Sequence, residues 1–168
     1  MRKLQKICIH WTAGTSTPTA LDYQHYHYTV DWRGAVKRGK FVPQDNIPPL
    51  RNGRYAAHCG GGNSYCIGVS LCGMAGYKSP ANPGRYPLTD KQCEAAWELV
   101  ARLCIEHDID VTPDTVFTHY EFGIRNPKSD SAGKIDITHL PYQPKLTKNQ
   151  IGDFIRNKVE WYKQRGAD

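Results

Sequence analysis

Two histidines and one aspartate are the residues of this sequence whose types and positions could bind a metal ion. His10 follows the apolar run that begins at Ile7, and His119 follows the run that begins at Val116. A strand holds its last side chain at a fixed height and angle, so two strand-end imidazoles and one carboxylate, here Asp136, can form a three-ligand site. A catalytic zinc ion has three protein ligands and an open position for water. These residues therefore predict a hydrolase.

Strands are expected at the segments that must position these residues. Residues 6–10 and 116–118 are apolar and β-branched, and residues 66–72 are apolar on both faces, which is typical of a central strand. Residues 26–32 alternate in strand fashion and lead through a turn into residues 35–37, which predicts a β-hairpin. The sheet would therefore combine strands from distant parts of the chain.

Helix-start signatures occur between and after these strands. Thr89 and Gln92 can form a capping box, and apolar residues follow at helical spacing up to Cys104. A second signature at residues 147–150 predicts a final helix, and residues 17–19 look like an earlier helix start. The final helix is expected to turn an apolar face inward, made of Ile151, Phe154, Ile155, Val159 and Tyr162.

The remaining segments and the chain length indicate a single folded unit. Residues 43–63 and 122–134 are rich in Gly, Pro, Asn and other polar residues, so we expect irregular loops there. A chain of 168 residues without repeats or linkers fits one domain. We therefore predict an α/β fold in which a single domain, residues 1–168, has a mixed central β-sheet flanked by α-helices.

The composition narrows the expected partners and location. The net charge of +6 suits an anionic partner, although the basic residues are scattered in a way typical of a solvated surface. No apolar run is long enough for a membrane span, and the basic N-terminus leads into a strand rather than a signal core. The six cysteines include no C-x-x-C pair, so we expect reduced thiols and no structural zinc knuckle.

Five short blocks occur along the chain in a characteristic order. They are ICIHWTAG at residues 7–14, YHYTV at 26–30, AHCGGGN at 57–63, IGVSLCG at 67–73 and THYE at 118–121. Together they resemble the type 2 N-acetylmuramoyl-L-alanine amidases, a family that includes phage lysins and the peptidoglycan-recognition proteins. The resemblance extends from about residue 6 to about residue 142.

The resemblance implies a Zn²⁺ cofactor and cleavage of the amide between N-acetylmuramic acid and L-alanine. The first two zinc ligands of the family correspond to His10 and His119. The third is a Cys or Asp two residues after a Lys, and both Asp130 and Asp136 fit. We favour Asp136 because Ile135 and Ile137 could anchor it in the core, whereas Asp130 lies in a polar turn. Asp130 remains the alternative, because the separation between His119 and Asp136 is longer than in many members of the family and Asp130 lies closer to His119 in the sequence.

Further catalytic roles are also implied by the resemblance. Lys134 would oppose the negative charge that develops on the amide oxygen, and Lys128 would replace it if Asp130 were the ligand. Tyr26 would assist the attacking water. Glu121 would orient a ligand histidine or carry a proton.

Binding roles fall on the glycine-rich block. His58 and Asn63 are expected to bind substrate, although the glycines beside them could serve only a tight turn. His139 is a further candidate ligand, with a surface or supporting position as the simpler reading.

The sequence thus predicts a phage or prophage lysin that acts on peptidoglycan as a monomer, without nucleic acid or membrane insertion. It would be made in the host cytoplasm without a signal peptide and reach the periplasmic wall after release. Two alternatives are a non-catalytic peptidoglycan-binding module and a cytoplasmic amidase that recycles muropeptides. A metal-dependent nuclease would need Lys and Arg beside the metal, where this sequence is aromatic and glycine-rich.

Overall fold

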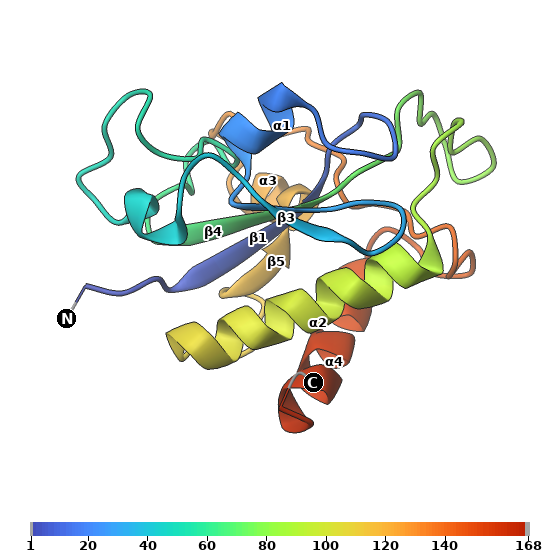
Figure 1. The fold of residues 1–168 in the computed structure, drawn as a ribbon. Helices are drawn as coiled ribbons and strands as arrows, with labels where there is room; N and C mark the ends of the chain where they lie inside the picture. The colour runs from blue at the N-terminus through green and yellow to red at the C-terminus, as the bar shows by residue number, and fades with distance from the viewer. Residues whose placement is uncertain (1, 167–168) are drawn as a thin grey trace.

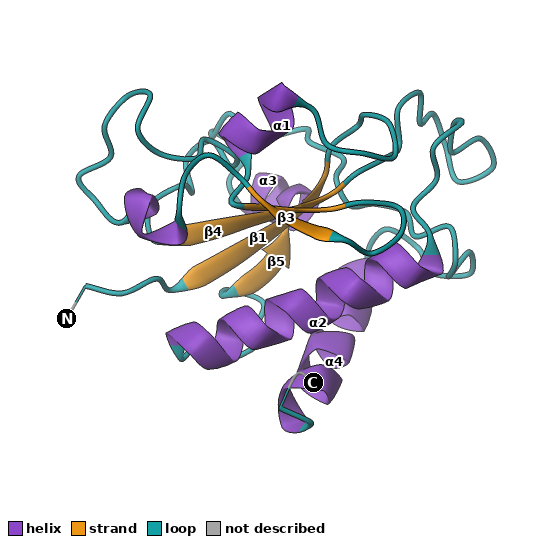
Figure 2. Ribbon diagram, viewed as in Figure 1, coloured by secondary structure: helices purple, strands orange, loops and turns teal. Residues whose placement is uncertain are grey.

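The computed structural model describes residues 2–166, and a mixed sheet of five strands lies at its centre (Figures 1 and 2). The strand order is β3-β2-β4-β1-β5, with β1 parallel to β4 and β5, β2 parallel to β4, and β3 antiparallel to β2. The strands are β1 (Lys6–Trp11), β2 (Tyr28–Val30), β3 (Val36–Arg38), β4 (Cys66–Leu71) and β5 (Val116–Thr118). The predicted hairpin is β2–β3, and the predicted central strand is β4.

Helices cover both faces of this sheet. They are α1 (Ala20–His25), α2 (Asp90–His107), α3 (His119–Arg125) and α4 (Ile151–Gln164), with a short 3₁₀ helix, η1, at Pro43–Asn46. In Figure 1, α2 and α4 lie together below the sheet, and α1 lies on the opposite side. The predicted class, an α/β domain with a mixed sheet flanked by helices, is confirmed.

The alternation of side chains along β1 separates the two faces of the sheet. Ile7 and Ile9 are fully buried in the main apolar core, which also contains Trp97 of α2 and Ile155 of α4. Side chains two residues apart on a strand point to the same face. His10 therefore points to the opposite face, the one that α1 covers.

The N-terminus of α2 is fixed as the sequence predicts. Thr89 Oγ1 accepts a hydrogen bond from Gln92 N–H, and Gln92 Oε1 accepts one from Thr89 N–H, both at 3.1 Å. The Gln92 side-chain amide also donates to the backbone carbonyls of Val30 and Cys72. The cap therefore ties α2 directly to the ends of β2 and β4.

The final helix agrees with its prediction only in part. Gln150 Oε1 accepts from Thr147 N–H at 2.9 Å, but this contact precedes a turn and the helix begins at Ile151. Of the expected inward face, Phe154 and Tyr162 are only partly buried. The fully buried members are Ile151, Ile155 and Val159.

Three other expected segments differ from the structure. Tyr26, expected to begin a strand, is instead the C-cap of α1, and the strand starts at Tyr28. The loop predicted for residues 43–63 begins with η1, and the loop predicted for 122–134 begins with the last turn of α3. Short helices of one or two turns have too few residues to show a helical period in the sequence.

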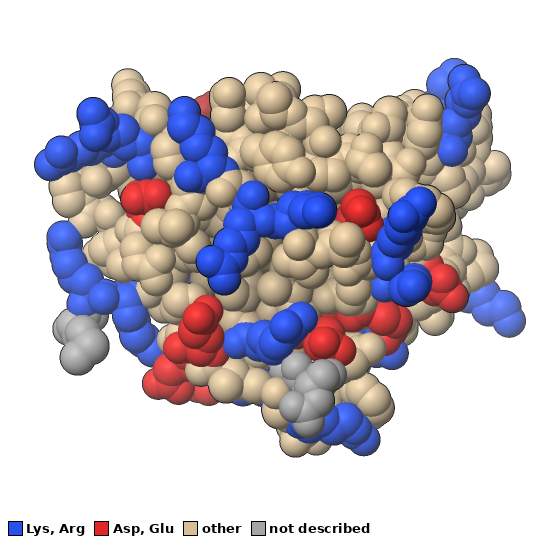
Figure 3. All heavy atoms as spheres, viewed as in Figure 1, with Lys and Arg blue, Asp and Glu red and all other residues tan. Residues whose placement is uncertain are grey.

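The structure also shows how charged side chains lie on one face of the molecule and whether the cysteines are paired. Basic side chains are spread over the face seen in Figure 3 and alternate with acidic ones. All six cysteines are buried, and none of them forms a disulfide within residues 2–166. No helix in this described range is long and apolar enough to cross a membrane.

Candidate metal centre

Three potential ligand atoms from separate segments meet on the α1 side of the sheet. The Nδ1 atom of His10, near the end of β1, lies 2.8 Å from Asp136 Oδ2 and 3.2 Å from the Nδ1 atom of His119. His119 Nδ1 lies 3.2 Å from the same carboxylate oxygen. The two histidines meet because β1 and β5 are parallel neighbours, and His119 directly follows β5.

Of the two candidate aspartates, only Asp136 joins the histidines. Its backbone carbonyl accepts a hydrogen bond from Tyr120 N–H at 2.6 Å, and Ile137 beside it is 1% exposed. Ile135 is 49% exposed, so the expectation that it also anchors Asp136 in the core is wrong. Asp130 is exposed, lies against the backbone of Gly60 and is not part of the ligand cluster.

A chain of hydrogen bonds fixes the proton positions on His10. The Nε2 atom of His58 lies 3.1 Å from the carbonyl oxygen of Cys66, which can only accept, so this nitrogen carries a proton. Burial lowers the pKa of His58 well below its usual value, so its Nδ1 atom is a free acceptor at neutral pH. It lies 3.0 Å from His10 Nε2, which must therefore donate. Burial lowers the pKa of His10 to about 4, so the ring is neutral, and with its proton on Nε2 the Nδ1 atom can offer a lone pair to a metal ion.

A second series of hydrogen bonds, through Ser131, fixes the position of the proton on neutral His119. The Ser131 hydroxyl donates to the carbonyl oxygen of Gly60 at 2.8 Å, so its oxygen is left to accept. His119 Nε2 lies 2.9 Å from this oxygen and donates to it. In the neutral form of His119, the Nδ1 atom therefore also presents a lone pair.

The donor set fits a cation. Burial opposes ionisation of Asp136, but the contacts with His10 and His119 outweigh it and lower the pKa of this carboxyl. With their Nε2 atoms protonated, the two imidazoles can both turn an Nδ1 lone pair toward the carboxylate only where a cation, in place of a shared proton, lies between them. Nitrogen and oxygen donors of this kind suit a zinc ion with a fourth, open position.

A second group, formed by Cys8, His10 and His58, also has its donor atoms within 4.8 Å of one another. Cys8 is fully buried, and burial raises the pKa of its thiol well above the usual value. The facing nitrogens of the two histidines already share a hydrogen bond. Cys8 also does not line the pocket described next, so the group that contains Asp136 is the better candidate metal site.

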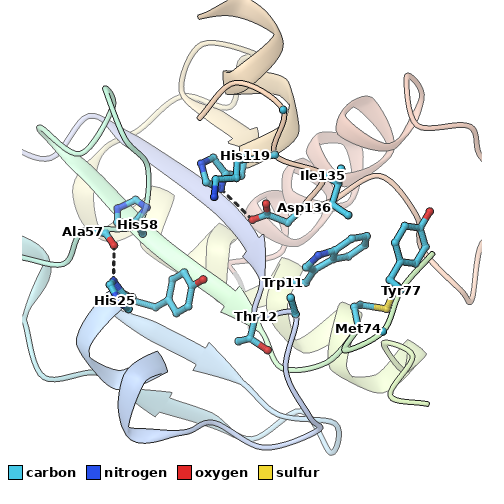
Figure 4. A pocket seen from close by; sticks show the side chains of 15 residues that line it. Trp11, Thr12, His25, Ala57, His58, Met74, Tyr77, His119, Ile135 and Asp136 are labelled. Atoms are coloured by element: carbon cyan, nitrogen blue, oxygen red, sulfur yellow. Dashed lines mark hydrogen bonds and ion pairs between the residues drawn. The ribbon is translucent and has the colours of Figure 1, made fainter. Parts of the chain in front are cut away.

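The ligand cluster opens into a pocket of about 590 Å³. His119 and Asp136 line this pocket and lie side by side in Figure 4. Lys134, Tyr26 and His58 also line it. The arrangement can therefore present a metal, a cationic ammonium group and a phenol to one bound molecule.

Tyr26 lies close to the ligands although it is not in a strand. Its ring centroid is 5.1 Å from that of His10. Burial and the negative charge of Asp136 raise the pKa of the Tyr26 hydroxyl above its usual value. In the chain without metal, Tyr26 is therefore a proton donor at neutral pH.

Two residues predicted for the site are used elsewhere. Glu121 accepts from the Thr118 backbone N–H and receives two hydrogen bonds from the Arg156 guanidinium, each 2.9 Å long, and it does not line the pocket. Its role is to cap α3 and tie it to α4. Asn63 does not line the pocket either; its Oδ1 accepts from the backbone N–H groups of His58 and Cys59 and shapes their loop.

The remaining candidates lie outside the ligand cluster. Lys128 is exposed and does not line the pocket. His139 is 3% exposed, which excludes the expected surface position, and its ring stacks on Tyr77 with centroids 6.1 Å apart. Tyr77, unlike His139, lines the pocket.

Two residues of the site, Ser131 and His25, are not among the candidates predicted from the sequence. Ser131 lies in a polar segment where a serine is common, and only the fold brings it to His119. His25, in the last turn of α1, lines the pocket and its Nδ1 atom is 2.8 Å from the Ala57 carbonyl oxygen (Figure 4).

Several solved structures are similar to this fold. N-acetylmuramoyl-L-alanine amidase LysC from Clostridium intestinale URNW aligns with a TM-score of 0.54 at 15% identity, over 95% of this chain and 87% of that one. A point mutant of PlyL aligns with a TM-score of 0.56 at 19% identity, over 95% and 86%. Bumblebee PGRP-SA aligns with a TM-score of 0.50 at 17% identity, over 86% and 82%. At these identities, the likeness establishes the fold.

The sequence comparison assigns the family. No curated protein matches the chain. A family model described as N-acetylmuramoyl-L-alanine amidase matches residues 1–136, a range that includes both histidines, Lys134 and Asp136. The chain therefore belongs to the N-acetylmuramoyl-L-alanine amidase family.

Proposed function

We propose that this protein is a zinc-dependent amidase that hydrolyses the bond between the lactyl group of N-acetylmuramic acid and L-alanine in peptidoglycan. The observation that carries the proposal is the convergence of three potential ligand atoms, from His10, His119 and Asp136, beside an open pocket. Family membership supplies the bond that would be cut.

The reaction needs a nucleophile and an electrophile at the same place. Water adds to the lactyl carbonyl carbon, the carbon–nitrogen bond breaks, and the departing alanine nitrogen takes a proton. A zinc ion held by the three ligands would polarise the carbonyl and lower the pKa of a water toward ~7.

Lys134 and Tyr26 are the residues of this chain placed to assist that reaction. Lys134 is exposed, lines the pocket and stands two residues before Asp136, so its ammonium group can approach the carbonyl oxygen as negative charge develops there. Tyr26 is protonated in the metal-free chain and can orient the water or donate a hydrogen bond to the same oxygen. Neither group has to replace a zinc ligand.

The biological role that we propose is lysis by a phage or prophage enzyme that reaches the periplasmic wall after release. The proposal follows from the resemblance of the sequence blocks to those of phage lysins and from the match to the amidase family. The protein would work as a monomer, since all proposed ligands come from one chain.

The product chemistry of purified sacculi tests the proposal. Mass spectrometry of the soluble products should show intact glycan with free lactyl carboxylates, together with stem peptides that carry a free L-alanine amine. A chelator should stop the release, and added Zn²⁺ should restore it. Binding to sacculi without any such product would indicate a recognition module instead. Cleavage of free muropeptides but not of sacculi would indicate a recycling amidase.

A further inference from the structure

In each of the two ligand histidines, His10 and His119, the Nε2 atom points away from the proposed metal position and makes a hydrogen bond to another side chain. The Nε2–H group of His10 donates to His58, and the Nε2–H group of His119 donates to Ser131, which in turn donates to Gly60. We infer that His58 and Ser131 are positioning residues for the zinc ligands and that the glycine-rich loop 58–63 joins them into one support. This inference rests on the proposed zinc site.

The ring of His58 has little freedom to leave its place. Its backbone N–H donates to Asn63 Oδ1 at 3.0 Å, and its Nε2–H donates to the Cys66 carbonyl. The ring also packs directly on the backbone of Gly68 in β4, because a Cβ atom there would lie 2.6 Å from the His58 ring. His58 therefore offers an acceptor at a fixed point behind His10.

Ser131 is fixed by contact between two loops. It is fully buried, and its hydroxyl reaches back to the Gly60 carbonyl. A Cβ atom at Gly60 would lie 2.7 Å from the Cβ atom of Asp130, and one at Gly61, where φ is 86°, would lie 2.9 Å from Ser129. The glycines therefore allow the 58–63 loop to lie against the segment that carries Ser131.

In this arrangement, the glycine-rich loop 58–63 supports the two ligand histidines and does not serve only to contact substrate. Hydrogen bonds to the far nitrogen of a ligand histidine fix its tautomer and ring orientation and raise its basicity. Loss of such a partner typically lowers metal affinity about 10–100-fold. We expect that loss at either histidine, because each has one such partner in residues 2–166.

The test is zinc affinity, measured by competition with a chromophoric chelator on folded, metal-free protein. His58→Leu and Ser131→Ala should each weaken binding about 10–100-fold. His58→Gln can still accept from His10 and donate to the Cys66 carbonyl, so it should retain most of the wild-type affinity. Ser70→Ala is the matched control. Ser70 is fully buried and lies opposite His10 on β4, and its hydroxyl, which lies near that of Tyr26, makes no hydrogen bond to either ligand histidine within residues 2–166.

A merely structural role makes a different prediction. His58→Leu and Ser131→Ala would then lower the melting temperature of the metal-free protein but leave zinc affinity at the wild-type value, and the inference would fail. Equal affinity losses in His58→Gln and His58→Leu would also overturn it. Cobalt(II) substitution gives a second readout, because the visible bands should shift in His58→Leu and Ser131→Ala and remain unchanged in Ser70→Ala.

The two proposals fail in different ways. If the wild-type protein does not bind zinc, the proposed amidase mechanism is wrong. If the wild type binds zinc and both support variants bind it equally well, the mechanism stands and only the positioning role is wrong.

Discussion

The two faces of the sheet are built from different kinds of sequence. The face toward α2 and α4 is covered by long helices whose apolar residues recur with a regular period, including Trp97 and Ile155. The opposite face has the six-residue α1 and several loops over it, and its inward side chains include His10 and Cys8. Regular packing therefore stabilises one face, while hydrogen bonds between loops arrange the other.

This difference predicts that substitutions on the two faces should have separable effects. Changes on the α2–α4 face should lower stability and leave the zinc site intact in the molecules that remain folded. Changes on the site face should lower zinc affinity or turnover and leave the fold largely unchanged.

The largest effect is expected from removing a ligand. His10→Ala and His119→Ala should each abolish zinc binding and sacculus hydrolysis, because two ligands cannot hold a catalytic zinc ion in an open site. The metal-free variants should melt close to the metal-free wild type. Wild-type hydrolysis by either variant would show that the metal assignment is wrong.

A large effect on the other face is expected from Trp97→Ala. Trp97 is fully buried and its indole N–H donates to the Tyr142 hydroxyl, so the substitution should lower the free energy of unfolding by about 3–5 kcal/mol. Urea denaturation measures this loss. Zinc bound per folded molecule should not change, and a parallel loss of zinc affinity would contradict the separation of the two faces.

Lys134→Ala tests the charge that faces the pocket. Zinc affinity should be retained, while the turnover number should fall by about 10²–10³-fold, the usual cost of removing one transition-state contact. Lys128→Ala is the control, because Lys128 is exposed and outside the pocket. An equal fall of the turnover number in both variants would show that Lys134 does not specifically stabilise the transition state.

A smaller effect should appear as a pH dependence of stability through His27. Its Nδ1 atom accepts from Gly68 N–H and its Nε2 atom faces Asn46 Oδ1, so protonation would break a buried contact. Burial lowers the pKa of His27 to about 4. The unfolded chain, with a pKa near 6.5, binds the proton first, so stability is complete above that value and falls as the pH drops toward 4.

The expected loss from His27 is about 2 kcal/mol between neutral pH and pH 5. Urea denaturation of the metal-free protein at several pH values measures it, with His27→Gln as the variant that cannot titrate. The slope between pH 6.5 and pH 5 should be smaller in His27→Gln. An unchanged slope would show that other groups carry the dependence.

The sequence predicted the regular parts of the molecule because periodic patterns are local. The β4 strand and the cap at Thr89 follow from such patterns. Thr118 and Glu121 have the spacing of a capping box, and the structure contains that capping box at the start of α3. The actual position of Tyr26 follows from α1, which is too short to show a helical period, whereas Ser131 reaches His119 only through contacts between distant segments.

The choice between Asp136 and Asp130 also illustrates this limit. Both aspartates follow a lysine by two residues, and the preference for Asp136 relied on two flanking isoleucines. Only Ile137 is buried, so only one of the two expected anchors exists. The position of Asp136 depends on the packing of Ile137 and on the hydrogen bond from Tyr120, which only the folded chain shows.

Zinc binding and hydrolysis by Asp136→Asn and Asp130→Asn, measured beside the wild type, test the central claim most directly. The wild type and Asp130→Asn should each bind one zinc ion and release stem peptides with a free L-alanine amine. Asp136→Asn should lose both properties and retain the fold by circular dichroism. Full zinc binding and hydrolysis in Asp136→Asn, or their loss in Asp130→Asn alone, would contradict the account.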